Sequence, residues 1–522
     1  MGCHRVSFSF LVWIKYRVPA LTPDDELPLG SDVHSAVRRG TVVVASCQVA
    51  TQLVAVAILA VLYHQLGPQP YGYLGMVLPW ILFLRIFASL GLNVAAVQKS
   101  SLSKSELDAL FWAQQLSGFI TFLLTAAGAP WLAMIYGVPE LVPVVLALSA
   151  TTLLVSLGAT HQALMERHLR MTRLSLLRLV AQIVGGGSAV LAALTGWGVW
   201  ALVVQQYSEL VFLGVGTWLL EPWRPRFPQR IGSMGELLRF GGYWTVSSFI
   251  LNLGQCLDKV LLGIWVAASP NGLAAVGMYT QAFQLMMKPV YLVTSPLSQI
   301  MLPALSRARS QPESYASLLH GFYRMVAIVL FPCGIGLAII GTDIMHVLGG
   351  DRWSTAGRIL SLLAPAIVVL GFVNLLGTVF ASASRTDRLL QASVVVTVTL
   401  LLALVVGLTL GAHWGPPGTG PVMGLAVTYS VTMWMIAIPY ILFAWNSVGV
   451  SVSGLLAALR GPLLATIVMG IVLGILRTGM THTLLLSPAL RLVTFLIVGI
   501  LVYVSVARQE IHWLRQQLSG KP

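Results

Sequence analysis

Charged side chains are scarce in this chain. Asp, Glu, Lys and Arg together make up 9% of the 522 residues, whereas hydrophobic residues make up 57%. Soluble domains carry about 25% charged residues, so a soluble globular protein is excluded. Acidic residues are the rarer class, 17 against 31 basic ones, which gives a formal net charge of +14. On a soluble protein that excess would indicate a nucleic-acid partner, but the positions of the basic residues argue against one here.

Cysteines and catalytic motifs are also few. The four cysteines form no CxxC pair, so neither a disulfide framework nor a metal site is expected. The sequence has no Walker motif, no HExxH and no GxGxxG after a strand. No polar stretch between apolar runs exceeds about 25 residues, which leaves little room for an external catalytic domain. We therefore expect no cofactor and no enzymatic activity.

Long apolar runs take the place of these missing features. A membrane-spanning helix needs about 20 mostly apolar residues. Lipid offers no partner to backbone polar groups, so such runs are expected to be helical. The sequence predicts an all-α polytopic membrane protein with about 14 transmembrane helices, at residues 40–63, 72–98, 107–135, 139–162, 174–195, 197–220, 236–264, 274–297, 315–342, 355–381, 386–410, 420–446, 454–476 and 483–506.

Basic residues fall in alternate connections between the runs. They precede the first run and follow the even-numbered ones, as with Arg38, Arg39, Lys99, Lys104, Arg167, Arg170, Arg173, Arg224, Arg226, Arg307, Arg309, Arg385, Arg388 and Arg460. The positive-inside rule then predicts that both termini are cytoplasmic. The exceptions are Arg352, Arg358 and Arg477, which lie in connections assigned to the external side.

The two halves of the chain show weak self-similarity. Tyr71-Gly72-Tyr73 at the second run matches Val276-Gly277-Met278-Tyr279 at the eighth. Each half has six runs, so the halves share one orientation, which predicts a pseudo-twofold axis along the membrane normal. The expected organisation is an N-terminal cytoplasmic tail 1–37, an N-lobe 38–220, a linker 221–235, a C-lobe 236–446, two extra helices 447–507 and a cytoplasmic tail 508–522.

Two cations lie deep inside apolar runs. Arg85 is midway along the second run, and Lys288 is at a similar depth in the eighth, its repeat partner. Charge near the bilayer centre costs at least about 3 kcal/mol and usually marks a binding site or pathway. Two interpretations remain open. Either both cations face a cavity and hold an anionic group, or each is neutralised within its lobe, Arg85 by Glu209 and Lys288 by Asp258.

Polar side chains at helical spacing accompany these cations. They form stripes on single helix faces, namely Gln48 and Gln52, then Asn252, Gln255 and Lys259, and finally Gln281, Gln284 and Lys288. Amides bind sugar hydroxyls, but in membranes they also hold helices together. A stripe that ends in Lys favours a cavity lining, so these residues and Arg85 form the predicted substrate-binding set. Asp258 and Glu209 are candidates for gating or ion coupling.

Other charges in the runs have simpler interpretations. Arg178, Arg324 and Arg460 lie within about two turns of the predicted cytoplasmic face, where long side chains reach the headgroups. Pro289 lacks an N–H and is expected to bend the eighth run beside Lys288. Arg491, in the fourteenth run, lies outside the repeat and has no predicted role.

Several stretches carry a family resemblance. They are YGYLGMVLPW, ASLGLNVAAVQ, ALMERHLRMTRLSLLRLVA, LDKVLLG, GMYTQAFQLMMKPV, MLPALSR and LGGDRWSTAGRILSLLAP. In order and spacing the chain resembles Wzx-type oligosaccharide flippases of the polysaccharide transport family, in particular the branch of the colanic-acid exporter. That family belongs to the superfamily of multidrug, oligosaccharidyl-lipid and polysaccharide exporters. The likeness covers about Ser35 to Trp445.

The resemblance implies a fold and a function. It implies two six-helix lobes around a central cavity, and translocation of an undecaprenyl-diphosphate-linked oligosaccharide by alternating access for cell-surface polysaccharide biosynthesis. In the lipid II flippase branch, an arginine at the place of Arg85 lines a cationic cavity. The expected partners are the lipid-linked oligosaccharide and membrane lipid, with a polysaccharide polymerase and glycosyltransferases as further candidates. A wet cavity would spare the sugar hydroxyls a desolvation cost of roughly 2–7 kcal/mol each.

Two alternative functions remain. A multidrug or cation antiporter of the same superfamily would favour an acidic cavity, whereas the first run has amides and the second an arginine. An O-antigen polymerase or ligase is disfavoured by the short connections. Proton or sodium coupling through Asp258 or Glu209 is left open by the sequence.

Overall fold

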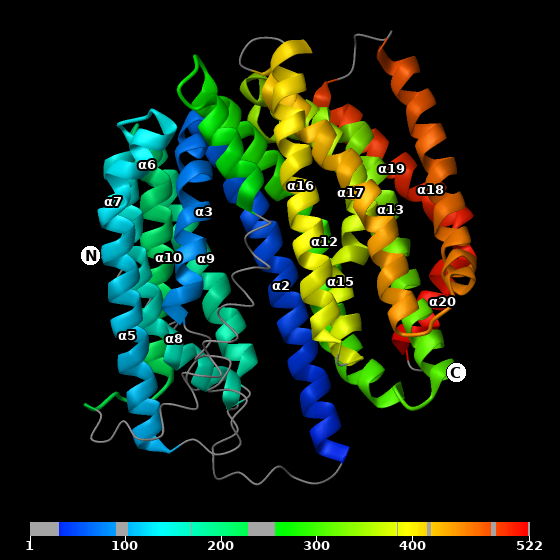
Figure 1. Cartoon of the computed structure of the whole chain (residues 1–522), viewed down its shortest axis with the longest axis horizontal. Coiled ribbons are helices and arrows are strands. Elements are labelled where there is room, and N and C mark those ends of the chain that lie inside the picture. The colour runs from blue at the N-terminus through cyan, green and yellow to red at the C-terminus, as the bar shows by residue number, and fades with distance from the viewer. Residues whose placement is uncertain are drawn as a thin grey trace. The chain divides into compact units, whose positions relative to one another are not determined.

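The computed structural model describes residues 31–89, 103–168, 170–227, 256–383, 385–414, 419–481 and 487–519. These residues form α-helices and short 3-10 helices, and no strand occurs among them (Figure 1). The helices are α2 (Ser31–Leu66), α3 (Gln69–Ser89), α5 (Lys104–Ala127), α6 (Ala129–Tyr136), α7 (Leu141–Ser149), α8 (Thr151–Arg167), α9 (Met171–Leu194), α10 (Val199–Leu220), α12 (Gly272–Ala308), α13 (Pro312–Gly349), η1 (Asp351–Trp353), α14 (Ser354–Leu363), η2 (Ala364–Ala366), α15 (Ile367–Ser382), α16 (Thr386–Trp414), α17 (Gly420–Ser447), α18 (Val452–Thr481), α19 (Pro488–Val506) and α20 (Arg508–Ser519).

The described helices confirm an all-α polytopic membrane protein. Among them, 11 spans are long and apolar enough to cross a membrane, and each coincides with one predicted run. The long helices α3 and α12 stand at the second and eighth runs. The seventh run lies largely outside the described residues, which resume as a helical segment over 256–266.

Three predicted spans are interrupted. Gly128 separates α5 from α6, whose first turn contains Pro130. Pro365 lies in η2, between α14 and α15, since proline cannot donate to the helix ladder. Ala150 separates α7 from α8 without a proline. By contrast, α12 continues through Pro289, Pro296 and Pro303.

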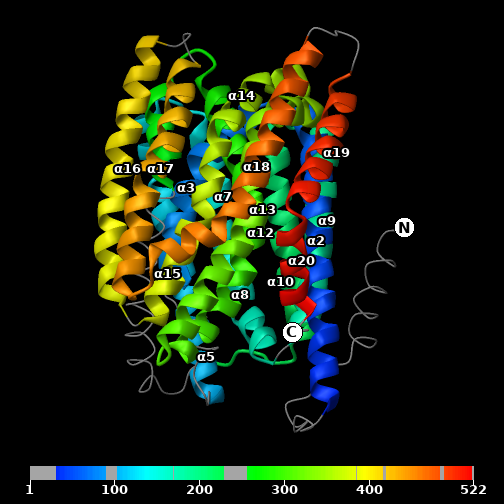
Figure 2. The ribbon, with the colours of Figure 1, turned by 90° about the vertical axis from the view of Figure 1, so that its right-hand side faces the viewer.

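The chain divides into two compact units, of which the first comprises Met1–Leu66 and Met76–Leu253. Within it α9 packs against α2 and α10, and α8 packs against α5 and α10 (Figure 2). The segment after α10 returns to α5. Trp112 Nε1 donates to the Arg226 carbonyl at 3.0 Å, and the Trp112 ring stacks on Phe227 at 4.6 Å.

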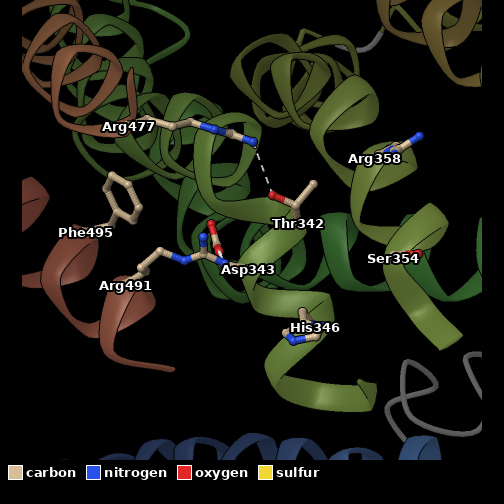
Figure 3. A pocket seen from close by; sticks show the side chains of 8 residues that line it. All are labelled: Thr342, Asp343, His346, Ser354, Arg358, Arg477, Arg491 and Phe495. Carbon is tan, nitrogen blue, oxygen red and sulfur yellow. Dashed lines mark hydrogen bonds and ion pairs between the residues drawn. The ribbon is translucent and has the colours of Figure 1, made fainter. Parts of the chain in front are cut away.

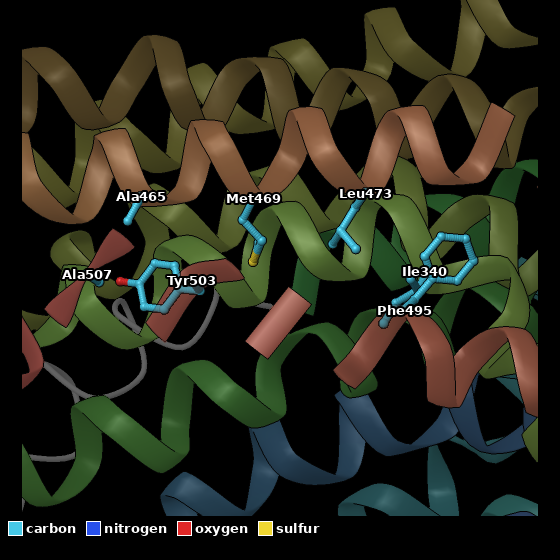
Figure 4. Packing of buried hydrophobic residues seen from close by; sticks show 7 residues of the cluster. All are labelled: Ile340, Ala465, Met469, Leu473, Phe495, Tyr503 and Ala507. Carbon is cyan, nitrogen blue, oxygen red and sulfur yellow. The ribbon is translucent and has the colours of Figure 1, made fainter. Parts of the chain in front are cut away.

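The second unit comprises Gly67–Gly75 and Gly254–Pro522. Here α13 packs against α12, α14, α15, α18 and α19, while α16 and α17 lie side by side (Figures 1 and 2). An apolar cluster joins α18 and α19 to α13 (Figure 4), and its buried members are Ile340, Ala465, Met469, Leu473, Phe495, Tyr503 and Ala507. Tyr503 also donates its hydroxyl to the buried Ile328 carbonyl at 2.8 Å. The two helices outside the predicted repeat are therefore packed into this unit.

The start of α3 crosses the start of α12 at two glycines within the second unit. A Cβ on Gly72 would lie 2.0 Å from the Leu273 carbonyl oxygen, and one on Gly277 would lie 2.0 Å from the Pro68 carbonyl oxygen. Each glycine therefore contacts the residue that lies four positions before the other glycine in the sequence. This reciprocity is what a twofold relation between equivalent segments produces, and Gly72 and Gly277 are equivalent in the predicted repeat.

Both predicted tails contain helix. α2 begins at Ser31, and α20 covers Arg508–Ser519. Arg324 of α13 donates to Glu510 of α20 at 2.6 Å, and its guanidinium lies 4.3 Å from the centroid of the Trp513 ring. Arg324 thus has a protein partner in the predicted cytoplasmic tail, and contact of its side chain with headgroups stays a prediction. The sequence does not show that a segment 186 residues away returns to Arg324.

Candidate functional site

Arg85 of α3 is half-buried in the first unit and bonds to a hydroxyl. Its Nη2 donates to Thr151 Oγ1 at 2.9 Å. Its Nε is buried and has no hydrogen-bond partner among the described residues. No described carboxylate lies within ion-pair distance of the guanidinium, and the Arg85 charge is not neutralised by Glu209 in the described structure.

The acceptor Thr151 stands at the interruption between α7 and α8. Thr151 donates to the Leu148 carbonyl at 2.5 Å, and Ser149 and Thr152 make the same bond to carbonyls three residues earlier. Such local bonds compete with the helix ladder, which accounts for a break without proline. Tyr207 of α10 donates to the Ala147 carbonyl at 2.5 Å. Interrupted helices are common where transporters bind their substrates.

No described hydrogen bond or ion pair joins the other predicted site residues of the first unit to Arg85. Glu209 of α10 packs against Gly185 of α9, where an added Cβ would lie 2.8 Å from the Glu209 Cβ. The glycine therefore makes room for the glutamate. On α2, Gln48 is exposed and Gln52 is half-buried. No described hydrogen bond joins either amide to Arg85.

Lys288 of α12, in the second unit, has no described carboxylate partner. Its side chain is half-buried. In the same stripe Gln281 is buried and Gln284 is exposed, so the three residues have different surroundings although they share a helical spacing. Asn252 and Gln255, which extend the neighbouring stripe, lie outside the described residues.

Asp258 is occupied by other partners, so it does not neutralise Lys288. Lys259 Nζ lies 2.9 Å from Asp258 Oδ1 and 3.0 Å from Oδ2, and the Tyr279 hydroxyl donates to Oδ2 at 3.0 Å. Lys259 Nζ also lies 3.8 Å from the centroid of the Phe283 ring, a cation–π contact. Lys259 is therefore committed to a local pair, and its place in a substrate-binding stripe stays a prediction.

Sequence reasoning missed the partners of these charges. The sequence indicates no role for Thr151 or Phe283, and Tyr279 enters only through the repeat. The only available signal for Thr151 was the hydroxyl-rich run Ser149-Ala150-Thr151-Thr152 in the middle of an apolar span. Tyr279 and Phe283 lie four residues apart on α12, which puts both on the face that meets 258–259.

Chemically, the described residues provide cationic and amide groups on helices at the predicted runs. Cations with unused donors suit an anionic group such as a diphosphate, and amides suit hydroxyls. Among the residues that the structure describes, no three His, Cys, Asp or Glu side chains are grouped closely enough to hold a metal ion.

A family model described as "Polysaccharide biosynthesis protein" matches residues 61–358, which is more than half of the chain. The teichuronic acid biosynthesis protein TuaB of Bacillus subtilis (strain 168) is 24% identical over 307 residues, covering 58% of this chain and 62% of that protein. The lipopolysaccharide biosynthesis protein WzxC of Escherichia coli (strain K12) is 21% identical over 352 residues, covering 67% of this chain and 70% of that protein. The match thus spans about two thirds of the length of these relatives.

The fold is also similar to that of a solved membrane transporter. The lipid II flippase MurJ in an inward closed conformation aligns with a TM-score of 0.71 at 11% identity, covering 91% of this chain and 99% of that chain. At this identity the likeness concerns the fold. It agrees with the fold that the sequence resemblance implied.

Proposed function

We propose that this chain, which belongs to the family of polysaccharide biosynthesis proteins, is a flippase for a lipid-linked oligosaccharide. Its substrate would be an undecaprenyl-diphosphate-linked repeat unit, moved across the inner membrane by alternating access. The observation that carries the proposal is the family match over residues 61–358. The names of TuaB and WzxC place those relatives in the synthesis of surface polysaccharides.

The intramembrane cations support this choice of substrate. Arg85 keeps a buried Nε without a described hydrogen-bond partner, and Lys288 has no described carboxylate partner. A diphosphate can use such donors, because charge-assisted hydrogen bonds to phosphate are among the strongest in proteins. A cationic drug would be repelled by the same groups, which disfavours the antiporter.

We also propose how the chain sits and moves. The alternating basic connections favour cytoplasmic termini. Residues 38–220 and 236–446 would rock as two lobes, exposing the substrate first to one side and then to the other. The lipid tail would stay in the bilayer while the sugars cross in water. Asp258 or Glu209 would carry a coupling ion if transport is coupled.

Complementation of a strain that lacks its own flippase tests the proposal. Arg85→Ala and Lys288→Ala should each reduce surface polysaccharide, because each removes a cation that would hold the diphosphate. Arg178→Ala is the matched control, since Arg178 is an exposed arginine whose Nη2 pairs with Glu166 at 3.1 Å. It should complement fully.

Membrane abundance of every variant must equal that of the wild type, measured by quantitative immunoblot. If both Arg85→Ala and Lys288→Ala complement fully at that abundance, the assigned binding role is wrong. If the wild type fails to complement any flippase-null strain but confers drug resistance, the antiporter is the better function.

A further inference from the structure

Three arginines are among the residues that line one pocket in the second unit (Figure 3). The pocket encloses about 290 Å³, is partly open, and is lined by Thr342, Asp343, His346, Ser354, Arg358, Arg477, Arg491 and Phe495. Thr342, Asp343 and His346 come from α13, Ser354 and Arg358 from α14, Arg477 from α18, and Arg491 and Phe495 from α19. Helices distant in sequence therefore build one basic site.

All four helices meet this pocket at one of their ends. α13 ends at Gly349 and α18 at Thr481, whereas α14 begins at Ser354 and α19 at Pro488. The alternation of basic connections assigns this end to the external side. Arg358 and Arg477 are exceptions to that alternation, and here they lie in the same pocket together with Arg491, for which the sequence indicated no role. Basic residues placed against the general bias, yet gathered in one site, indicate a local function.

Two of the three arginines are held in place by α13. Arg491 Nη2 lies 3.1 Å from Asp343 Oδ1. Arg477 donates to Thr342 Oγ1 at 3.3 Å, and its other terminal nitrogen contacts the Ile339 carbonyl. Figure 3 shows both side chains reaching toward α13. Anchoring of this kind fixes guanidinium groups in advance of a ligand, which lowers the entropic cost of binding.

These arginines retain donors that no described residue uses. A guanidinium has five N–H donors, and the described bonds employ only part of them. Arg491 Nε is buried without a hydrogen-bond partner, which is rare in folded proteins. Arg358 has no described hydrogen bond or ion pair. The lining carboxylate is Asp343, and Asp351 pairs at 3.3 Å with His346, so cationic groups outnumber carboxylates in the pocket.

We propose that this pocket binds a phosphate group on a ligand at the external end of α13, α14, α18 and α19. Planar guanidinium forks match phosphate oxygens in pairs, and several of them together favour a multiply charged anion over a single carboxylate. Thr342 and Ser354 add hydroxyl donors to the lining. The phosphate can belong to a lipid headgroup of the outer leaflet, to a lipid-linked diphosphate or to a free ion. The proposal stands independently of the flippase activity.

Binding to the purified full-length protein in detergent micelles tests this. The probes are phosphatidylglycerol, undecaprenyl diphosphate and sodium pyrophosphate, with diacylglycerol as the uncharged lipid control, each titrated and followed by native mass spectrometry. The variants are Arg358→Gln, whose side chain is exposed and has no described partner, and Ser354→Asp, which adds a negative charge to the lining. Arg352→Gln is the matched control, because Arg352 is an exposed arginine of the same connection outside the lining.

We expect at least one phosphate probe to bind the wild type. Diacylglycerol should bind every variant as it binds the wild type. Arg358→Gln and Ser354→Asp should each raise the Kd of that probe by about tenfold, the usual scale for one hydrogen bond to a charged group. Arg352→Gln should leave the Kd unchanged. Which probe responds identifies the source of the phosphate. The proposal is overturned if, for every phosphate probe, the two pocket variants bind with the same Kd as Arg352→Gln while all variants keep the melting temperature of the wild type.

Discussion

At the scale of single residues, the structure separates two kinds of charge in the predicted runs. Asp258 and Lys259 satisfy one another, with Tyr279 and Phe283 beside them. Arg85 and Lys288 have no described carboxylate partner. A buried pair fixes local structure, whereas a cation without a counter-charge remains available to an anionic ligand.

Asp258→Asn should destabilise the protein. It removes the carboxylate charge that faces Lys259, and breaking one side of a buried pair typically costs about 3–5 kcal/mol. The measurement is the thermal unfolding midpoint in detergent. Tyr279→Phe removes only the hydroxyl bond to Asp258 and should cost about 1 kcal/mol.

The single variant Lys259→Gln and the double variant Asp258→Asn/Lys259→Gln complete a double-mutant cycle. Because neither group is then charged, the double variant should recover part of the stability lost in Asp258→Asn, with a coupling of about 0.5–3 kcal/mol. Simple addition of the two single effects would contradict the pairing.

At the scale of elements, the crossing of α3 and α12 depends on two glycines. A Cβ at Gly277 would approach the Pro68 carbonyl oxygen to 2.0 Å, so Gly277→Ala must push the two helix ends apart. Overpacking of this kind costs about 1–3 kcal/mol, and a lowered thermal midpoint should report it.

Gly377→Ala is the matched control for the crossing. Gly377 lies inside α15, and a Cβ there would meet no atom within 4 Å. Alanine favours a helix over glycine by about 1 kcal/mol, so this variant should be as stable as the wild type or more so. Equal destabilisation of the two variants would argue against the close crossing.

The C-terminal helix α20 provides a second test at this scale. Arg324→Ala removes the ion pair with Glu510 and the contact with Trp513. We expect faster hydrogen exchange over 508–519, because this ion pair ties α20 to α13. The other described neighbours of α20 are α19 and Gly461 of α18, which lies beside Glu510. Arg307→Ala, at an exposed arginine of α12, should leave that exchange unchanged.

These elements show what could be predicted from the sequence. Apolar length predicted the spans, because lipid forces each run into a helix. Repeat spacing identified Gly72 and Gly277 as equivalents. The partners of charges could not be predicted, since Asp258 and Tyr279 are 21 residues apart and Arg324 and Glu510 are 186 apart. Their contacts depend on helix packing, which spacing along one helix does not encode. The pocket of Arg358, Arg477 and Arg491 was missed for the same reason.

At the scale of the whole molecule, the central proposal is that this protein moves a lipid-linked oligosaccharide across a membrane. Family membership, membrane-spanning helices and intramembrane cations support it together.

Translocation in proteoliposomes tests that claim most directly. Purified protein is reconstituted with a fluorescent undecaprenyl-diphosphate-linked oligosaccharide, and the fraction that becomes accessible to a membrane-impermeant quencher is followed in time. The account predicts that accessibility rises faster than in protein-free liposomes, that Arg85→Ala and Lys288→Ala slow the rise at equal reconstitution, and that Arg178→Ala does not. A wild-type rate equal to that of protein-free liposomes, with the protein folded and inserted, would contradict it.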